Sequence, residues 1–246
     1  MTDEIGKEFI KKTQYKYMEP SAQSKGLTQP PLELDHDSSQ QIIDLPRPQE
    51  LTIKEMSLRR VIESRESVRK YSDQSLTLTE LSWLLWCTQG VKEVIGTRAT
   101  LRTVPSAGAR HAFETYLLVN NVNGLQEGLY RFLAIDHKLL LVNQDASIAE
   151  EITKAALDQS HVKKCNVTFL YVAIVERMKW RYGVRGYRYL HLDAGHVGQN
   201  LYLASENIGC GVCAIAAFED EELNRVLDLD GEEQFVIYLL TVGKKR

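Results

Sequence analysis

The chain has 246 residues, 43% of them hydrophobic, so it can form one large domain or two small ones and bury a sizeable core. Its formal net charge is −3 and it has no long basic run, which argues against nucleic acid or an anionic membrane surface as a partner. No run of about 18 apolar residues predicts a membrane span, and residues 1–9 lack the apolar core of a signal peptide. We therefore expect a cytoplasmic protein that does not enter a membrane.

Residues 1–50 differ from the rest of the chain. They are polar and hold five of the six prolines. This composition predicts an N-terminal extension with little regular structure that wraps the body or a partner subunit. The domain proper is then expected to cover residues 51–246.

The body is predicted to mix helices and strands without regular alternation, which indicates the α+β class. Thr77 and Glu80 form the pattern of a capping box at the start of one helix, and Gly90 suits its end. Apolar spacings of three and four predict a long helix over residues 187–208. Other helices are expected at 51–64, 146–159 and 219–227. Strands are expected at 115–119, 129–132, 138–142, 167–175 and 234–242.

Arg65, Ser67 and Arg69 are spaced two apart in the segment that follows the first of these helices. In an extended backbone such residues point to the same side, so two guanidinium groups would flank a hydroxyl. Guanidinium forks match phosphate oxygens, and the hydroxyl can donate a further hydrogen bond. The pattern indicates a phosphate site, and the competing interpretation is a solvated basic turn.

Three further segments are candidates for the same site. Residues 105–110 carry small side chains that allow a flat ligand to approach the backbone, although an ordinary loop has the same composition. Residues 209–218 are predicted to connect two helices as a loop whose amides could face a ligand ring, or to be a tightly packed loop. Lys244 and Arg246 form a basic tail that could reach a phosphate.

Two other patterns suggest different chemistry. Cys210 and Cys213 have the spacing of a redox motif, but no adjacent charge would stabilise a thiolate, so we expect buried thiols. His191, Asp193 and His196 could build a metal hydrolase. Residues five apart do not share a helix face, so we expect no metal site.

Taken in order, the segments 65–69, 105–108, 209–218 and 244–246 resemble the nitroreductase family of flavoproteins over roughly residues 50–246. The stretch 181–200 is similar to the SagB-type dehydrogenase branch of that family. Members of this branch oxidise thiazoline and oxazoline rings in modified peptides.

The resemblance implies an α+β sandwich with a central, mostly antiparallel sheet flanked by helices. It also implies an obligate homodimer with two FMN molecules at the subunit interface. Carried over by position, the residues expected to hold the phosphate, the ribityl chain or the neighbouring ring edge are Arg65, Glu66, Ser67, Arg69, Lys244 and Arg246. The other subunit would supply Pro105, Ser106, Ala107 and Gly108. The isoalloxazine ring would lie along Ala214, Ile215, Ala216 and Ala217.

The chain departs from the family pattern at three places. Ala109 stands where an amide side chain is frequent, so that ring contact passes to Arg110 or is lost. Ala216 and Ala217 replace a Glu-Gly pair, so only a backbone amide can face flavin N5. Arg181 and Tyr182 align with the Lys-Tyr pair of the azoline oxidases, and an arginine stays protonated where a lysine can act as a base.

These patterns leave two main hypotheses. The first is an FMN-dependent oxidoreductase that transfers hydride through flavin N5, with NAD(P)H or an oxidisable substrate as donor. A small molecule or a modified peptide would be the substrate, and Tyr182 is the candidate for proton transfer. The second is a non-catalytic flavin-binding or assembly subunit of a peptide-modifying complex.

Overall fold

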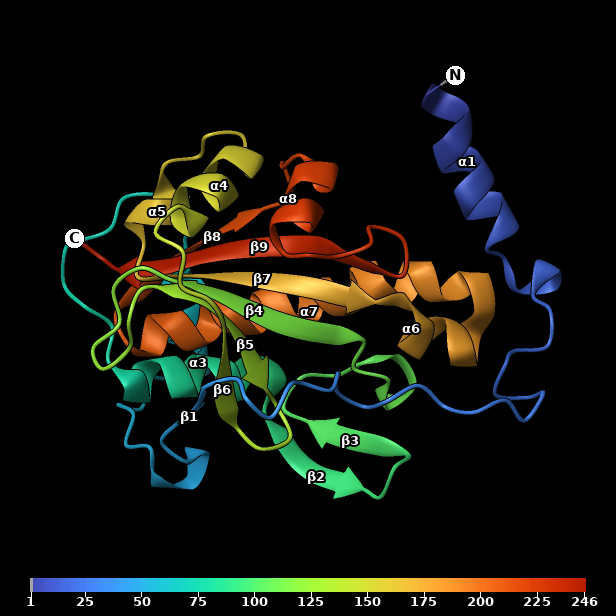
Figure 1. The fold of residues 1–246 in the computed structure, drawn as a ribbon, viewed down its shortest axis with the longest axis horizontal. Helices are drawn as coiled ribbons and strands as arrows, with labels where there is room; N and C mark the ends of the chain where they lie inside the picture. Colours follow the sequence, from blue (N-terminus) through green and yellow to red (C-terminus); the bar gives the residue numbers. More distant parts are fainter. Residues whose placement is uncertain (1) are drawn as a thin grey trace.

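A central antiparallel sheet of seven strands organises the chain (Figure 1). The computed structural model describes residues 2–246. The strands lie in the order β1-β6-β5-β4-β7-β9-β8, and every neighbouring pair is antiparallel. Their bounds are β1 Ile42–Asp44, β4 Phe113–Val119, β5 Gly128–Leu133, β6 Lys138–Asn143, β7 Val167–Ile174, β8 Cys210–Ile215 and β9 Gln234–Lys244. The strand at 234–244, late in the sequence, therefore lies inside the sheet, between β7 and β8.

Helices cover both faces of this sheet. The helices α3 (Leu78–Gln89) and α7 (Gly186–Asn207) pack on one face, where Leu84 and Leu201 join the larger apolar core. The helices α4 (Ile148–Ala155), α5 (His161–Lys164) and α8 (Asp220–Val226) pack on the other, where Ile152 and Leu223 belong to a second core. The predicted α+β sandwich is confirmed.

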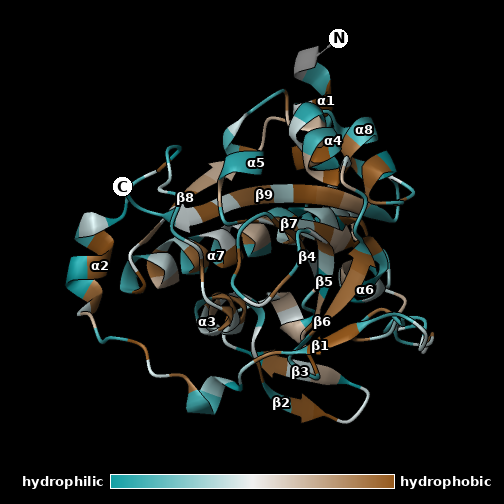
Figure 2. Cartoon of the chain, turned by 60° about the vertical axis from the view of Figure 1, so that its left-hand side comes forward, coloured by the Kyte–Doolittle hydropathy of each residue, from teal (hydrophilic) through white to brown (hydrophobic). Residues whose placement is uncertain are grey.

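Strand β7 shows why the sequence folds this way. All eight of its residues are buried, as the continuous apolar run predicts. Phe169 and Tyr171 point into the core beneath α3 and α7, whereas Leu170 and Val172 point into the core beneath α4 and α8. The period of two along one strand thus joins both layers. In Figure 2 hydrophobic residues are concentrated on the strands, including the separate hairpin of β2 (Val91–Ile95) and β3 (Ala99–Arg102).

Several predicted elements form with shifted ends. The capping box at Thr77 and Glu80 is present, and the helix that it starts ends at Gln89. The long helix covers 186–207 instead of 187–208. The prediction of a helix over 51–64 is wrong for its first half, because α2 covers only Leu58–Ser64. Ser57 caps this helix, since its hydroxyl accepts from the Arg60 N–H.

Two segments hold more regular structure than the sequence suggested. The N-terminal extension contains an 11-residue helix, α1 (Thr2–Lys12), that stands away from the body, as well as strand β1 at the edge of the main sheet (Figure 1). Residues 210–215, expected in a loop, form the edge strand β8. A helix at 175–182, α6 (Val175–Tyr182), was not predicted.

Candidate functional site

The predicted site residues form two clusters, and each cluster contacts helix α7. The first cluster is formed where the segment after α2 meets the free edge of β8. The second is formed by the loop at 105–110 and the end of α6. Residues Tyr202 and Asp193, which anchor the two clusters, are nine positions apart on α7. At 1.5 Å per residue this places them about 13 Å apart along the helix axis.

In the first cluster the chain runs alongside β8. The Val68 N–H donates to the Val212 carbonyl over 2.8 Å, and Ser67 forms a parallel bridge with Val212. A Cβ on Gly211 would lie 2.4 Å from a methyl carbon of Val68, so glycine is what permits this close approach. The arginine motif is therefore fixed to the edge strand whose small residues were expected to face a ring.

Tyr202, which sequence reasoning missed, joins the two halves of this cluster. Its hydroxyl lies 3.1 Å from the Ser67 hydroxyl and accepts the Ala214 N–H over 3.0 Å. The Arg65 guanidinium lies over its ring, 5.4 Å from the centroid. A half-buried tyrosine on a helix gives no motif, so only the three-dimensional contacts identify it.

The other basic residues expected at the phosphate, which are Arg69, Lys244 and Arg246, each have a different partner. Arg69 lies beside the Cys213 thiol; burial raises the pKa of this thiol, and the guanidinium opposes the rise. The Arg246 Nε donates to the Tyr71 carbonyl over 2.9 Å. Lys244 is buried, and its ammonium contacts the Glu80 carboxylate and the Ile208 carbonyl. Lys244 is thus committed to the start of α3 and the end of α7.

The remaining residues expected at the ribityl chain and the flavin ring are exposed or belong to β8. Glu66 is exposed beside Ser67, and Ala216 and Ala217 are exposed just beyond the end of β8. Ile215 points into the core beneath α4 and α8. The backbone of the β8 segment faces the arginine motif, with the Cys213 thiol beside Arg69 and Ala214 half-buried at the edge.

In the second cluster Asp193 holds the loop at 105–110. Its carboxylate accepts from the Ser106 hydroxyl over 2.6 Å and from the Ala107 N–H over 3.3 Å. Burial raises the pKa of Asp193, and the bonds to Ser106 and Ala107 oppose that shift. The carboxylate of the metal-hydrolase alternative is therefore engaged in fixing a loop. Pro105 is exposed at the start of this loop.

The same loop is strained. Gly108, Ala109 and His111 have φ values of 58°, 52° and 42°, in the left-handed region. The Ser106 hydroxyl accepts the His111 N–H over 2.9 Å and so closes the loop. Backbone strain of this kind persists only where surrounding contacts enforce it, and it is concentrated at functional sites.

Arg181 and Tyr182 lie directly against Gly108. A Cβ on Gly108 would be 2.5 Å from the Tyr182 hydroxyl and 2.7 Å from the Arg181 Nε. The ring of Tyr182 packs edge-on against Tyr189, with centroids 4.7 Å apart. Arg110, expected to replace a ring contact, donates to the carbonyls of Gly108 and Arg98 over 3.1 and 2.9 Å. The aligned Arg-Tyr pair and the small-residue loop therefore form one unit.

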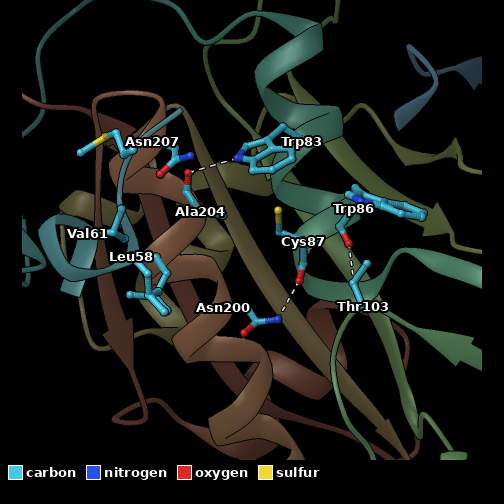
Figure 3. Close-up of a pocket in the computed structure, with 11 residues that line it drawn as sticks. Leu58, Val61, Trp83, Trp86, Cys87, Thr103, Asn200, Ala204 and Asn207 are labelled. Carbon is cyan, nitrogen blue, oxygen red and sulfur yellow. Dashed lines mark hydrogen bonds between the residues drawn. The ribbon is translucent and has the colours of Figure 1, made fainter. Parts of the chain in front are cut away.

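A cavity of about 350 Å³ lies between α2, α3 and α7 (Figure 3). Apolar side chains line much of it, and the Trp83 indole donates to the Ala204 carbonyl at its edge over 3.3 Å. Burial raises the pKa of the Cys87 thiol in this cavity to about 12. None of the predicted site residues line it.

The cysteine pair does not have the arrangement of a redox motif. Cys210 and Cys213 lie on strand β8, where residues three apart point to opposite faces. Both are buried, and burial raises the pKa of Cys210 to about 12. These thiols are small core residues.

The sequence matches the signature described as "Nitroreductase family" over residues 62–244. The chain belongs to the nitroreductase family. This range includes both clusters except Arg246 and begins after the N-terminal extension.

Three relatives are similar to this nitroreductase in sequence, and the first of them supports the family assignment. MJ1384 of Methanocaldococcus jannaschii, a protein named for the same family, is 36% identical over 193 residues, which cover 78% of this chain and 93% of that protein. The trifolitoxin-processing protein TfxB of Rhizobium leguminosarum bv. trifolii is 29% identical over 52% of this chain and 36% of its own length. The microcin B17-processing protein McbC of Escherichia coli is 26% identical over 52% of this chain and 49% of its own length.

Solved structures agree with the nitroreductase fold. A structure from Ralstonia eutropha, named for the same family, has a TM-score of 0.66 at 25% identity and covers 93% of this chain and 98% of its own. The E. coli microcin synthetase McbBCD complex with truncated pro-MccB17 bound has a TM-score of 0.62 at 22% identity, covering 82% of this chain and 77% of that one. The second likeness concerns the fold alone.

The donors of this nitroreductase's first cluster fit a phosphorylated ligand. Within the described part of the chain, Arg65 forms no ion pair, and Ser67 is exposed two residues further along, with both side chains at Tyr202. A guanidinium group without a carboxylate partner and an exposed hydroxyl beside the edge of β8 are donors that suit a phosphate monoester. No helix of the described residues is long and apolar enough to cross a membrane.

Proposed function

We propose that this nitroreductase-family protein is an FMN-dependent oxidoreductase. The observation that carries the proposal is the docking of Ser67 onto the edge of β8, with Arg65 over the ring of Tyr202, whose hydroxyl in turn accepts the Ala214 N–H. Arg65, Ser67 and Arg246 would hold the phosphate and ribityl chain, and the backbone at 214–217 would face the ring. Bound FMN would supply hydride transfer between a donor and an acceptor that bind in turn.

We further propose that the active form is a homodimer. The two clusters lie about 13 Å apart along α7 in one chain, so the loop at 105–108 of one subunit would complete the first cluster of the other. Leu58, which lines the cavity of Figure 3, exposes 65% of its surface, and Ile62 on the same helix exposes 55%. Exposed apolar side chains next to an apolar cavity favour a protein interface there.

The second cluster would supply the groups that contact the substrate. Tyr182 is the candidate for proton transfer, because its hydroxyl is next to the strained loop and its ring is fixed by Tyr189. Arg181 would carry positive charge toward a substrate oxygen without acting as a base. Quinones and nitroaromatics reduced with NAD(P)H are substrates that need no protein base.

A second candidate is azoline oxidation within a peptide-modifying complex. The similarity to TfxB and McbC favours it, although this chain covers only 36% and 49% of those proteins. Removal of a ring proton as hydride leaves calls for a base, and Arg181 cannot supply one. If the purified protein is yellow but turns over no substrate, it is a flavin-binding subunit. The arginine at position 181 in place of a lysine favours this alternative.

The cofactor proposal is tested by denaturing the purified protein and identifying what it releases. We expect FMN, because the donor set fits one phosphate group. Release of FAD, or no flavin after reconstitution, would contradict the proposal. Light scattering should show a dimer of the flavin-bound form, and a flavin-bound monomer would refute the shared site.

Arg65 variants test the phosphate contact directly. Arg65→Ala should weaken FMN binding by about 1.5–3 kcal/mol, and Arg65→Lys by less, because lysine keeps the charge and loses the fork. Fluorescence titration of FMN into the apoprotein measures both. Unchanged affinity in both variants would place Arg65 outside the site.

The Arg181 and Tyr182 pair separates the two candidate activities. We expect wild-type protein to oxidise azoline peptides poorly, Arg181→Lys to raise that activity and Tyr182→Phe to lower it. Anaerobic flavin reduction by each substrate is the measurement. Rapid flavin reduction by an azoline peptide in the wild type would show that Arg181 does not have the role assigned here.

A further inference from the structure

The Tyr202 hydroxyl has two hydrogen-bond neighbours, and one of them can only donate to it. It accepts the Ala214 N–H over 3.0 Å, and a backbone N–H can only donate. Its second neighbour is the Ser67 hydroxyl, 3.1 Å away. With one lone pair engaged by Ala214, the phenolic O–H is available to donate to Ser67.

This direction has a consequence for Ser67. If the Ser67 oxygen accepts from Tyr202, its own proton is released to point elsewhere. Ser67 is exposed, and Arg65, which lies over the Tyr202 ring, is its neighbour in the motif. The Ser67 proton would then point outward, next to the guanidinium group.

We propose that Tyr202 is a positioning residue of the flavin site, which orients the Ser67 hydroxyl as a donor to the phosphate or ribityl oxygens and supports Arg65 with its ring. This inference rests on the proposed FMN function. Tyr202 acts through Ser67 and Arg65 and takes no part in hydride transfer. Its two supports are separable, because the hydroxyl serves Ser67 and the ring serves Arg65.

The test is a double-mutant cycle read by FMN affinity of the apoprotein, measured by flavin fluorescence. Tyr202→Phe removes the hydroxyl and keeps the ring, so FMN binding should weaken about fivefold, the effect of one hydrogen bond. In a Ser67→Ala background the same substitution should change affinity less than twofold, because the acceptor is already gone. Tyr202→Leu should weaken binding more than Tyr202→Phe, because Arg65 also loses its support.

Tyr130→Phe is the matched control. It also removes a tyrosine hydroxyl and keeps the ring, here one that donates to the Gln126 carbonyl over 2.8 Å, but it lies on β5, four strands away from β8. At about 4.8 Å per strand this is roughly 19 Å from the site. Its FMN affinity should equal that of the wild type, and thermal unfolding of each apoprotein should confirm that the variants fold.

The outcomes separate this inference from the cofactor proposal. A wild type that binds no FMN refutes both. A wild type that binds FMN, with Tyr202→Phe unchanged, refutes the role of Tyr202 alone. An equal loss in the wild-type and Ser67→Ala backgrounds, or a similar loss in Tyr130→Phe, would also refute it, because Tyr202 would then not act through Ser67.

Discussion

Gly108 shows how much of the second cluster depends on one backbone position. Its positive φ disfavours a side chain, and a Cβ here would require the Tyr182 hydroxyl and the Arg181 side chain to move. The carbonyl of the same residue accepts from Arg110. Gly108 is therefore the point at which the loop, the Arg-Tyr pair and Arg110 meet.

Gly108→Ala should lower the free energy of unfolding by about 2 kcal/mol or more, because backbone strain and displacement of Tyr182 add together. Gly96→Ala is the matched control. Gly96 has a similar φ of 52°, but a Cβ there would have nothing within 4 Å, so we expect a loss of about 1 kcal/mol. Urea unfolding measures both, and equal losses would show that the Tyr182 contact is unimportant.

Among single residues, the sequence predicted those site residues that follow a regular spacing. The alternation of Arg65 and Ser67 indicated a shared direction, and the structure shows that both contact Tyr202. Arg69 and Lys244 could not be placed, because their positions depend on Cys213 and Glu80, which are far away in the sequence. Tyr202 itself gives no sequence signal.

At the scale of elements, His137 links three parts of the fold. It lies in the turn between β5 and β6, and its Nε2 is 2.8 Å from the Ser82 hydroxyl of α3. Ser82 donates to the Pro46 carbonyl over 2.6 Å, so it must accept from His137. Burial lowers the pKa of His137 to about 4, which means that the histidine is neutral in the fold.

Acid should therefore destabilise the protein below about pH 6.5. The unfolded chain binds a proton at His137 near that pH and the folded protein only near pH 4, so the free energy of unfolding falls as pH falls between them. His111, whose pKa burial lowers to about 3, contributes with the same sign. His137→Asn should reduce the loss between pH 7 and pH 5 by about 1 kcal/mol. Parallel stability curves for the two proteins would contradict this.

Elements with a strong local signal were predictable, and those that depend on a distant partner were not. The capping box marks the start of α3 within the sequence itself. Strand β8 has glycine, alanine and cysteine in place of typical strand residues, and it forms because β9 supplies the ladder. The start of α2 was placed too early because its apolar stripe is irregular.

At the scale of the molecule, the second half of the N-terminal extension is part of the body. Leu45 is only 6% exposed, and β1 pairs with β6. The Leu34 N–H donates to Glu114, and Arg177, which is ion-paired with Glu114, also donates to the Pro31 carbonyl. The composition predicted an extension that wraps the body or a partner subunit, but it did not identify the contacts, because they depend on buried charges of β4 and α6.

We propose that the folding unit begins near residue 29, and truncation tests this. Removal of residues 2–28 should change the free energy of unfolding by less than about 2 kcal/mol, because it removes mostly exposed contacts. Removal of residues 2–50 should cost more than about 3 kcal/mol, because the buried Glu114 and Arg177 lose hydrogen-bond partners. Urea unfolding and soluble yield measure both, and equal stability of the two truncations would refute the boundary.

The place of β9 inside the sheet also sets an order of events during synthesis. Strand β7 is complete at residue 174 and β8 at residue 215, but the strand that joins them spans 234–244. Until the ribosome has released that segment, the edge of β7 and all of β8 have unpaired backbone groups. A nascent chain in this state is exposed to edge-to-edge association, and the apolar residues of β7 are uncovered with it. The segment after α2 docks on β8 through Ser67 and Val68 and on β9 through Tyr71 and Ser72, so the arginine motif takes its place only after the sheet is complete.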